Sequence, residues 1–126
     1  MEKYRRVIAY KEYFEVFLDS LTPKVQAKVL QILRIVENVE VVPSNYLKHI
    51  EGTDGLYEIR IGFANLIFRV FCFFDSDKLV ILLSGFQKKS QKTPKREIDR
   101  ALSLMQEYIN EKNNENDKTY EDKNAV

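Results

Sequence analysis

The chain has 126 residues, a formal net charge of +1, one cysteine and one histidine. This length allows one domain with a hydrophobic core but not two, and a single Cys with a single His excludes an internal disulfide and argues against a dedicated zinc site. Because the longest apolar runs are too short to span a bilayer and the N-terminus lacks a secretion signal, we expect a cytoplasmic protein with no membrane partner.

The N-terminal third predicts a short strand and two helices. Residues 4–10 can form the strand, and apolar residues at helical spacing over 10–21 predict the first helix. Thr22 and Pro23 are typical of a helix start, with a hydroxyl N-cap followed by proline in the first turn. The apolar stripe over 25–36 predicts a second helix, and the two helices should form an antiparallel hairpin.

The hydrophobic period changes to that of strands after a glycine-containing loop at residues 51–55. Residues 56–61 alternate, and the apolar runs 66–74 and 79–86 follow after short turns. Short turns between neighbouring strands imply an antiparallel meander. The near-continuous apolar run 66–74 further predicts a sheet that is covered on both faces.

The last part of the chain predicts a helix and a tail. Thr93 and Pro94 repeat the helix-start signature, and an apolar stripe over 98–109 predicts the closing helix. Residues 111–126 carry five acids and three bases with almost no apolar side chain. We therefore interpret 1–110 as the folded α+β domain and 111–126 as a disordered polar tail.

A basic loop joins the last predicted strand to the closing helix. Its sequence over residues 85–96 is Gly-Phe-Gln-Lys-Lys-Ser-Gln-Lys-Thr-Pro-Lys-Arg, with five cations and no acid. The five are Lys88, Lys89, Lys92, Lys95 and Arg96. Such a loop can hold a phosphodiester backbone, and the alternative is a solvated surface loop rich in lysine.

Two arginines on neighbouring predicted strands can add to this basic surface. Arg69 interrupts an apolar run, where a guanidinium must reach solvent, pair with a carboxylate or face a site. Arg60 lies on the preceding strand, and antiparallel pairing can bring the two arginines and the loop lysines into one cleft. Glu58 shares the face of Arg60, so a structural ion-pair network is the alternative reading. We interpret Cys72 as a core residue and His49 as a loop residue.

Three motifs together resemble one known family. They are GLYEIR at residues 55–60, FRV at 68–70 and GFQKKSQKTP at 85–94. Their order and spacing closely resemble the phage-derived HigB-like branch of the RelE/ParE toxin superfamily, over about residues 4–109. The resemblance implies an α+β fold with an N-terminal strand and helical hairpin, an antiparallel sheet meander and a C-terminal helix.

The same resemblance implies the toxin of a type II toxin-antitoxin system. Such a toxin is an endoribonuclease that enters the ribosomal A site and cuts messenger RNA by 2′-hydroxyl attack, without metal or other cofactor. Its expected partners are the ribosome, the mRNA and a cognate helix-turn-helix antitoxin. Two alternatives stay open: a ParE-like inhibitor of DNA gyrase without catalysis, and an inactive remnant that only binds an antitoxin.

Motif positions also give candidate site residues. Arg60 and Arg69 match the basic residues that the family carries on its strands, and Lys89 and Lys92 are candidates for proton transfer. A lysine can act as a base only if its pKa falls well below the ordinary ~10.4, and crowding by cations lowers it. The residues expected to bind RNA are Lys48, Lys88, Lys95 and Arg96. No histidine, tyrosine or acid clearly takes the general acid or base role that several relatives have.

Overall fold

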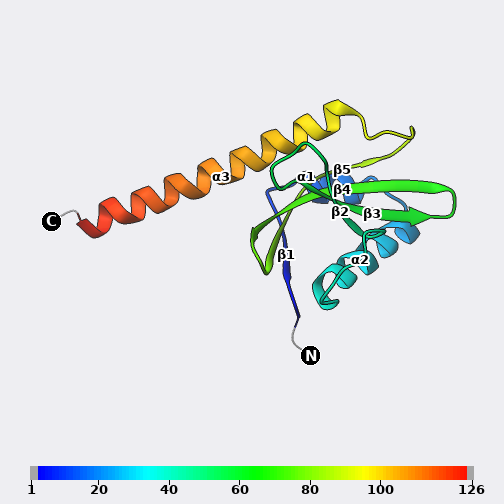
Figure 1. Cartoon of the computed structure of the whole chain (residues 1–126), viewed down its shortest axis with the longest axis horizontal. Helices are drawn as coiled ribbons and strands as arrows, with labels where there is room; N and C mark the ends of the chain where they lie inside the picture. Colours follow the sequence, from blue (N-terminus) through cyan, green and yellow to red (C-terminus); the bar gives the residue numbers. More distant parts are fainter. Residues whose placement is uncertain (1–2, 125–126) are drawn as a thin grey trace.

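The computed structural model describes residues 3–124, with side chains through Glu115, and places a five-stranded sheet between helices on both faces (Figure 1). The helices are α1 (Tyr13–Asp19), α2 (Pro23–Asn38) and α3 (Lys95–Asn124). The strands are β1 (Arg6–Ala9), β2 (Leu47–His49), β3 (Tyr57–Phe63), β4 (Leu66–Ser76) and β5 (Leu79–Gln87). Their order across the sheet is β1-β5-β4-β3-β2.

The predicted antiparallel meander is confirmed for β3, β4 and β5. β1 closes one edge by pairing parallel with β5, with Ile8 opposite Ile81. β2 forms the other edge antiparallel to β3, with Leu47 opposite Ile59. β2 was not predicted, because its three residues have no period of their own and are strand only through pairing with β3.

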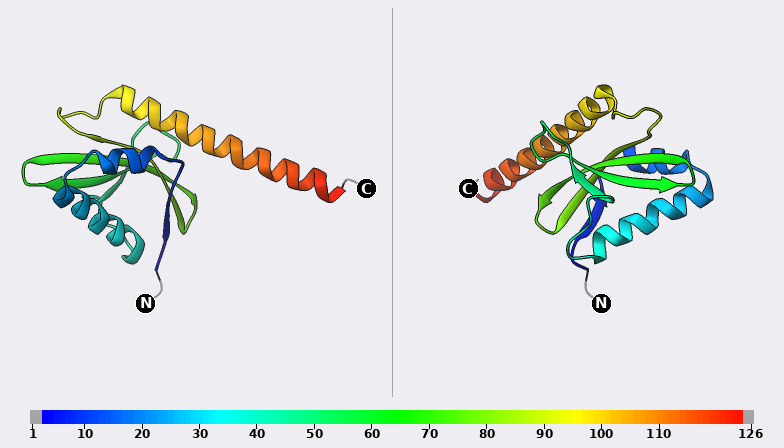
Figure 2. Two further views of the ribbon diagram at one scale, coloured as in Figure 1. Left: turned by 180° about the vertical axis from the view of Figure 1, so that it is seen from behind. Right: turned by 45° about the vertical axis from the view of Figure 1, so that its right-hand side comes forward.

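Helices cover both faces of the sheet, as the apolar run in β4 predicts (Figures 1 and 2). The core on one face packs against α1 and α2 and includes Val29, Ile32, Val36, Ile59, Ile61, Val70 and Cys72. The core on the other face packs against α3 and includes Leu56, Phe71, Phe73, Leu83, Ala101 and Leu104. Burial raises the pKa of the Cys72 thiol, in agreement with its interpretation as core.

The helix starts follow local backbone chemistry. The Thr22 hydroxyl accepts a hydrogen bond from the Val25 amide at 3.4 Å, as the N-cap signature predicts. α1 starts at Tyr13 and is shorter than predicted, because the Tyr10 amide donates to the Leu82 carbonyl and so continues the sheet. Lys11 then has φ 52°, a left-handed conformation that separates β1 from α1.

α3 starts at Lys95, one residue later than its signature predicts, and continues without a break to Asn124. The structure therefore has helix where the sequence predicts a disordered tail from residue 111, and residues 125–126 lie outside the described part of the chain. The C-terminal part of α3 projects beyond the sheet (Figures 1 and 2). Lys112 contacts Asp75 of β4 at 2.7 Å, so contacts cross the boundary predicted at residue 110.

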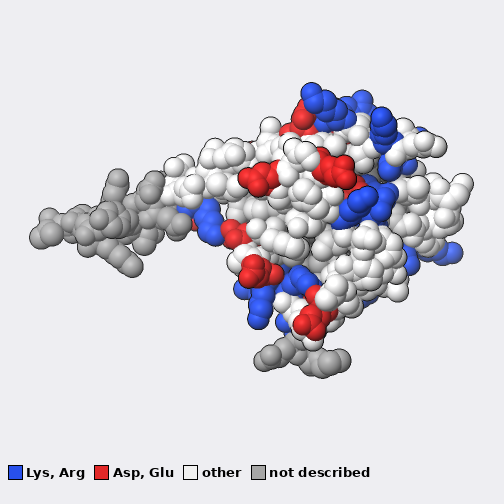
Figure 3. Space-filling model, viewed as in Figure 1, with Lys and Arg blue, Asp and Glu red and all other residues white. Residues whose placement is uncertain are grey.

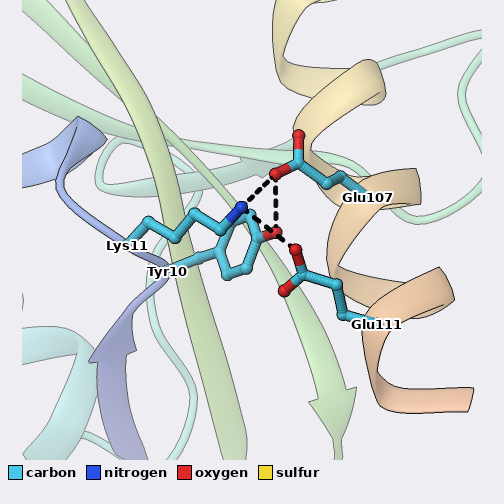
Figure 4. Close-up of polar contacts among 4 residues, drawn as sticks. All are labelled: Tyr10, Lys11, Glu107 and Glu111. Atoms are coloured by element: carbon cyan, nitrogen blue, oxygen red, sulfur yellow. Dashed lines mark hydrogen bonds and ion pairs between the residues drawn. The ribbon is translucent and has the colours of Figure 1, made fainter. Parts of the chain in front are cut away.

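A polar cluster fastens the middle of α3 to the end of β1. It consists of Tyr10, Lys11, Glu107 and Glu111, and we call it the helix clamp (Figure 4). The Tyr10 hydroxyl donates to Glu107 at 2.9 Å, and the Lys11 ammonium contacts Glu107 at 2.5 Å and Glu111 at 3.0 Å. Hydrogen bonding from Lys11 lowers the pKa of Glu107, while burial raises the pKa of Tyr10 to about 12.

Candidate functional site

The two predicted arginines lie directly opposite each other on neighbouring strands. Arg60 of β3 and Arg69 of β4 form a register pair, as antiparallel pairing allows. Arg69 is 6% exposed and lies opposite Phe86 of β5 on its other side. The Phe86 ring stacks on Phe71 at 5.6 Å, so the register partner of Arg69 belongs to an aromatic pair.

Glu58 lies between the two arginines. Its Oε1 atom is 3.4 Å from Arg60 Nε, and its Oε2 atom is 3.5 Å from Arg69 Nε. Arg69 Nη1 donates to the Phe68 carbonyl at 3.0 Å, but Arg69 Nε has no hydrogen-bond partner within the described residues. Burial lowers the pKa of Arg69; the Glu58 charge acts against this shift and the Arg60 charge adds to it.

A groove of about 780 Å³ opens over these arginines, and we call it the basic groove. Its lining consists of Arg60, Asn65, Leu66, Ile67, Arg69, Gln87, Lys88, Lys89, Ser90 and Gln91. The Lys88 amide donates to the Ile67 carbonyl at 2.8 Å, which fixes the start of the basic loop against β4. Burial lowers the pKa of the half-buried Lys88, and the Arg69 charge lowers it further.

A second hollow of about 360 Å³ adjoins the basic groove at the part of β3 that does not pair with β2. The two share Arg60, Ile67 and Arg69, and the second adds Lys28 of α2 and the residues Asn45 and Tyr46 before β2, among others. Sequence reasoning missed this part of the site. Lys28 reads as one of several polar residues on α2, and only the packing of α2 against β3 brings it here.

The other predicted residues lie around the basic groove. Lys89 lines it, whereas Lys92 is exposed in the loop and its carbonyl accepts a hydrogen bond from the Ser90 hydroxyl. Lys95 and Arg96 are exposed on the first turn of α3, and Lys48 is exposed on β2 opposite Glu58. Figure 3 shows basic side chains gathered over the start of α3 and the loop before it. The structure thus brings four of the eight predicted residues together and leaves four outside the groove lining.

The described residues contain neither a candidate metal site nor a membrane-spanning helix. Side chains are described for residues 3–115, and the backbone for residues 3–124. No three His, Cys, Asp or Glu side chains with described positions lie close enough together to hold a metal ion. No helix in the described part of the chain is both long and apolar enough to cross a bilayer.

A family model described as "Phage derived protein Gp49-like (DUF891)" matches residues 16–106, which is 91 of the 126 residues. The chain belongs to this family. The matched region contains α2, all of β2 to β5 and the basic loop, so the Gp49-like part includes every residue of the basic groove. A comparison with curated protein sequences gives no match.

Among solved structures, the Gp49-like chain is similar to a chain of the archaeal RelE–RelB complex from Pyrococcus horikoshii OT3. The two are 24% identical, with a TM-score of 0.51, and the similarity covers 71% of this chain and 99% of that one. The predicted RelE-like fold is thereby confirmed. The phage-derived family is also confirmed, whereas the HigB-like branch stays a prediction.

Proposed function

We propose that this Gp49-like protein is a toxin of the HigB type that cuts messenger RNA on the ribosome. The observation that carries the proposal is the basic groove, which is lined by Arg60, Arg69 and Lys88 and in which the two arginines flank one carboxylate, Glu58. Keeping opposed cations together on a sheet costs free energy, so a polyanion that neutralises them is the natural ligand. RNA phosphate has that chemistry.

The proposed reaction needs little beyond positioning and charge stabilisation. The 2′-oxygen attacks the phosphorus of its own 3′-phosphate while the bond from phosphorus to the 5′-oxygen breaks, which leaves a cyclic phosphate and a 5′-hydroxyl. A base takes the 2′-proton and an acid protonates the 5′-oxygen. Arg60 and Arg69 suit the growing charge on the phosphoryl oxygens, because a planar guanidinium can donate two hydrogen bonds to them.

Lys88 is the lysine that we propose for proton transfer, in place of Lys89 and Lys92. It is half-buried, lines the groove with both arginines and has a lowered pKa, so its neutral amine is more accessible than that of an ordinary lysine. Lys89 then contributes to phosphate binding. Lys92 is exposed outside the groove lining, which favours a contact with more distant backbone.

The proposed partners follow from the fold and the charge distribution. The archaeal RelE chain was solved with RelB, which supports a protein antitoxin as partner of this chain too. The exposed Lys95, Arg96 and Lys48 lie outside the groove, where they can contact ribosomal or messenger RNA backbone during translation in the cytoplasm.

The test is a reconstituted translation reaction. Purified protein is added to ribosomes that are translating a defined mRNA, and cut sites are mapped by primer extension, with DNA gyrase supercoiling measured in parallel. We expect ribosome-dependent cuts, a loss of about 10²–10³-fold in Arg69→Met and wild-type activity in the matched Arg34→Met, on the exposed side of α2. Gyrase inhibition without cuts would replace the proposal with a ParE-like function, and no effect on either target would leave an antitoxin-binding remnant.

A further inference from the structure

The direct opposition of Arg60 and Arg69 raises the question of what holds their side chains in place. Like charges directly opposite on antiparallel strands repel each other, so two free guanidinium groups would turn apart. Arg69 cannot turn to solvent, because it is 6% exposed. A group between them must therefore set the orientation of both.

Glu58 is placed to do this. It is 8% exposed, and each of its two carboxylate oxygens faces a different arginine, at 3.4 and 3.5 Å. Glu58 is two residues from Arg60 on β3, so both side chains stand on the same face of the sheet. The β3–β4 register then brings Arg69 to the other side of the same carboxylate.

The arginine atoms that contact Glu58 determine which guanidinium nitrogens remain available to bind a phosphate. In both pairs the closest approach to Glu58 is by Nε, at the side of the guanidinium rather than at its end. A phosphate can therefore be bound by the Nη groups of Arg60 and by Nη2 of Arg69, whose Nη1 donates to the Phe68 carbonyl, while the carboxylate stays in place. One carboxylate also leaves an excess of positive charge, since Arg60, Arg69 and Lys88 together outnumber it.

We propose that Glu58 is a positioning residue for RNA cleavage, which holds Arg60 and Arg69 by their Nε atoms so that both guanidinium ends face one phosphodiester of a single-stranded RNA. The proposal rests on the proposed function for its substrate. Glu58 acts through the arginines and does not touch the reacting atoms, because both of its oxygens already face a cation. This separates it from a general base.

The first test compares binding with cleavage in Glu58→Gln, which keeps the shape of the side chain and removes its charge. We expect the single-turnover cleavage rate on ribosomes to fall about 10²-fold, because misplaced groups lose most of their effect. Affinity for an RNA that lacks the attacking 2′-hydroxyl should stay equal or rise, since a negative charge has left the groove. Glu51→Gln, in an exposed loop, is the matched control and should keep full activity. An unchanged cleavage rate in Glu58→Gln, or equal losses of binding and cleavage, would overturn the proposal.

The second test does not depend on cleavage. In ¹⁵N-arginine-labelled protein, the Nε–H signal of the part-exposed Arg60 should be protected from solvent exchange in the wild type and lose that protection in Glu58→Gln, and the Nε–H signal of the buried Arg69 should change its chemical shift. Unchanged protection would overturn the positioning role even in an active enzyme. If the wild type cuts no RNA, the proposed function fails, and these signals alone decide whether Glu58 orients the two arginines.

Discussion

Two charged clusters on this molecule look alike in composition but differ in how their charges are satisfied. The helix clamp has two carboxylates, Glu107 and Glu111, around Lys11, with contacts of 2.5–3.0 Å and a tyrosine hydroxyl that adds a hydrogen bond. The arginine cluster has one carboxylate, Glu58, between two arginines at 3.4–3.5 Å. Arg69 Nε is buried there without a hydrogen-bond partner among the described residues.

The difference indicates different purposes. The helix clamp joins distant parts of the chain with short, complete contacts, as a cluster that stabilises a fold should. The arginine cluster keeps excess positive charge partly buried and incompletely bonded, which is costly unless a ligand completes it. Variants of the first cluster should therefore change stability, and variants of the second should change activity.

The largest effect should come from substitutions of Lys88, because they test whether the basic groove takes part in the reaction or only binds RNA. Lys88→Arg keeps a cation but cannot lose its proton near neutral pH, whereas Lys88→Ala removes the charge as well. If Lys88 transfers a proton, both variants should lose about 10²–10⁴-fold in single-turnover cleavage. The wild-type rate should also rise with pH below the lowered pKa of Lys88, and this dependence should vanish in Lys88→Arg. Full activity in Lys88→Arg would show that Lys88 contributes only its positive charge and transfers no proton.

A smaller effect should come from Gly85, which tests whether the groove depends on packing beneath it. A Cβ atom at Gly85 would lie 2.5 Å from the Phe17 ring, so in Gly85→Ala either the Phe17 ring of α1 or the end of β5 that leads to Lys88 must move. We expect a loss of roughly 1–3 kcal/mol in the free energy of unfolding, measured with urea. Gly62→Ala is the matched control, because nothing lies within 4 Å of its Cβ position. Equal stability of the two variants would contradict the packing argument.

The smallest effect should come from the helix clamp. Tyr10→Phe removes the hydrogen bond to Glu107 and should cost about 1 kcal/mol of stability with no change in cleavage. The folded pKa of Tyr10 is raised from 10.0 to about 12, so this stabilisation is complete below pH 10 and is lost as the pH rises toward 12. Urea unfolding of both proteins at pH 8, 10 and 12 should show the stability difference shrinking only in the last step. A stability difference between the two proteins that stays constant to pH 12 would show that the Tyr10 hydroxyl does not contribute to the helix clamp.

Much of the fold could be predicted because its signals are local. The period of apolar residues identified β3, β4, β5 and α2, and Thr22 with Pro23 gave the start of α2. β2 could not be found, since residues 47–49 become strand only by pairing with β3. The left-handed Lys11, which ends β1 before α1, has no sequence signature either.

The sequence could predict which charged residues the site contains and which face of a strand they share, but not their contacts. Arg60 and Arg69 could be expected on one surface, and Glu58 could be expected near Arg60. Contact of Glu58 with both arginines depends on the exact register of β3 against β4, which a sequence pattern does not contain. The continuation of the groove to Lys28 depends in the same way on how α2 packs.

The measurement that tests the central claim most directly is cleavage and unfolding of Arg69→Met on the same sample. Removing one partner of a buried ion pair destabilises a fold when it leaves the other charge unpaired, but Arg69→Met removes an excess cation and leaves Glu58 paired with Arg60. We predict a free energy of unfolding within about 1 kcal/mol of the wild type, together with loss of ribosome-dependent cleavage. Retained cleavage, or unfolding of the variant at low urea, would instead make the arginine cluster a structural ion-pair network.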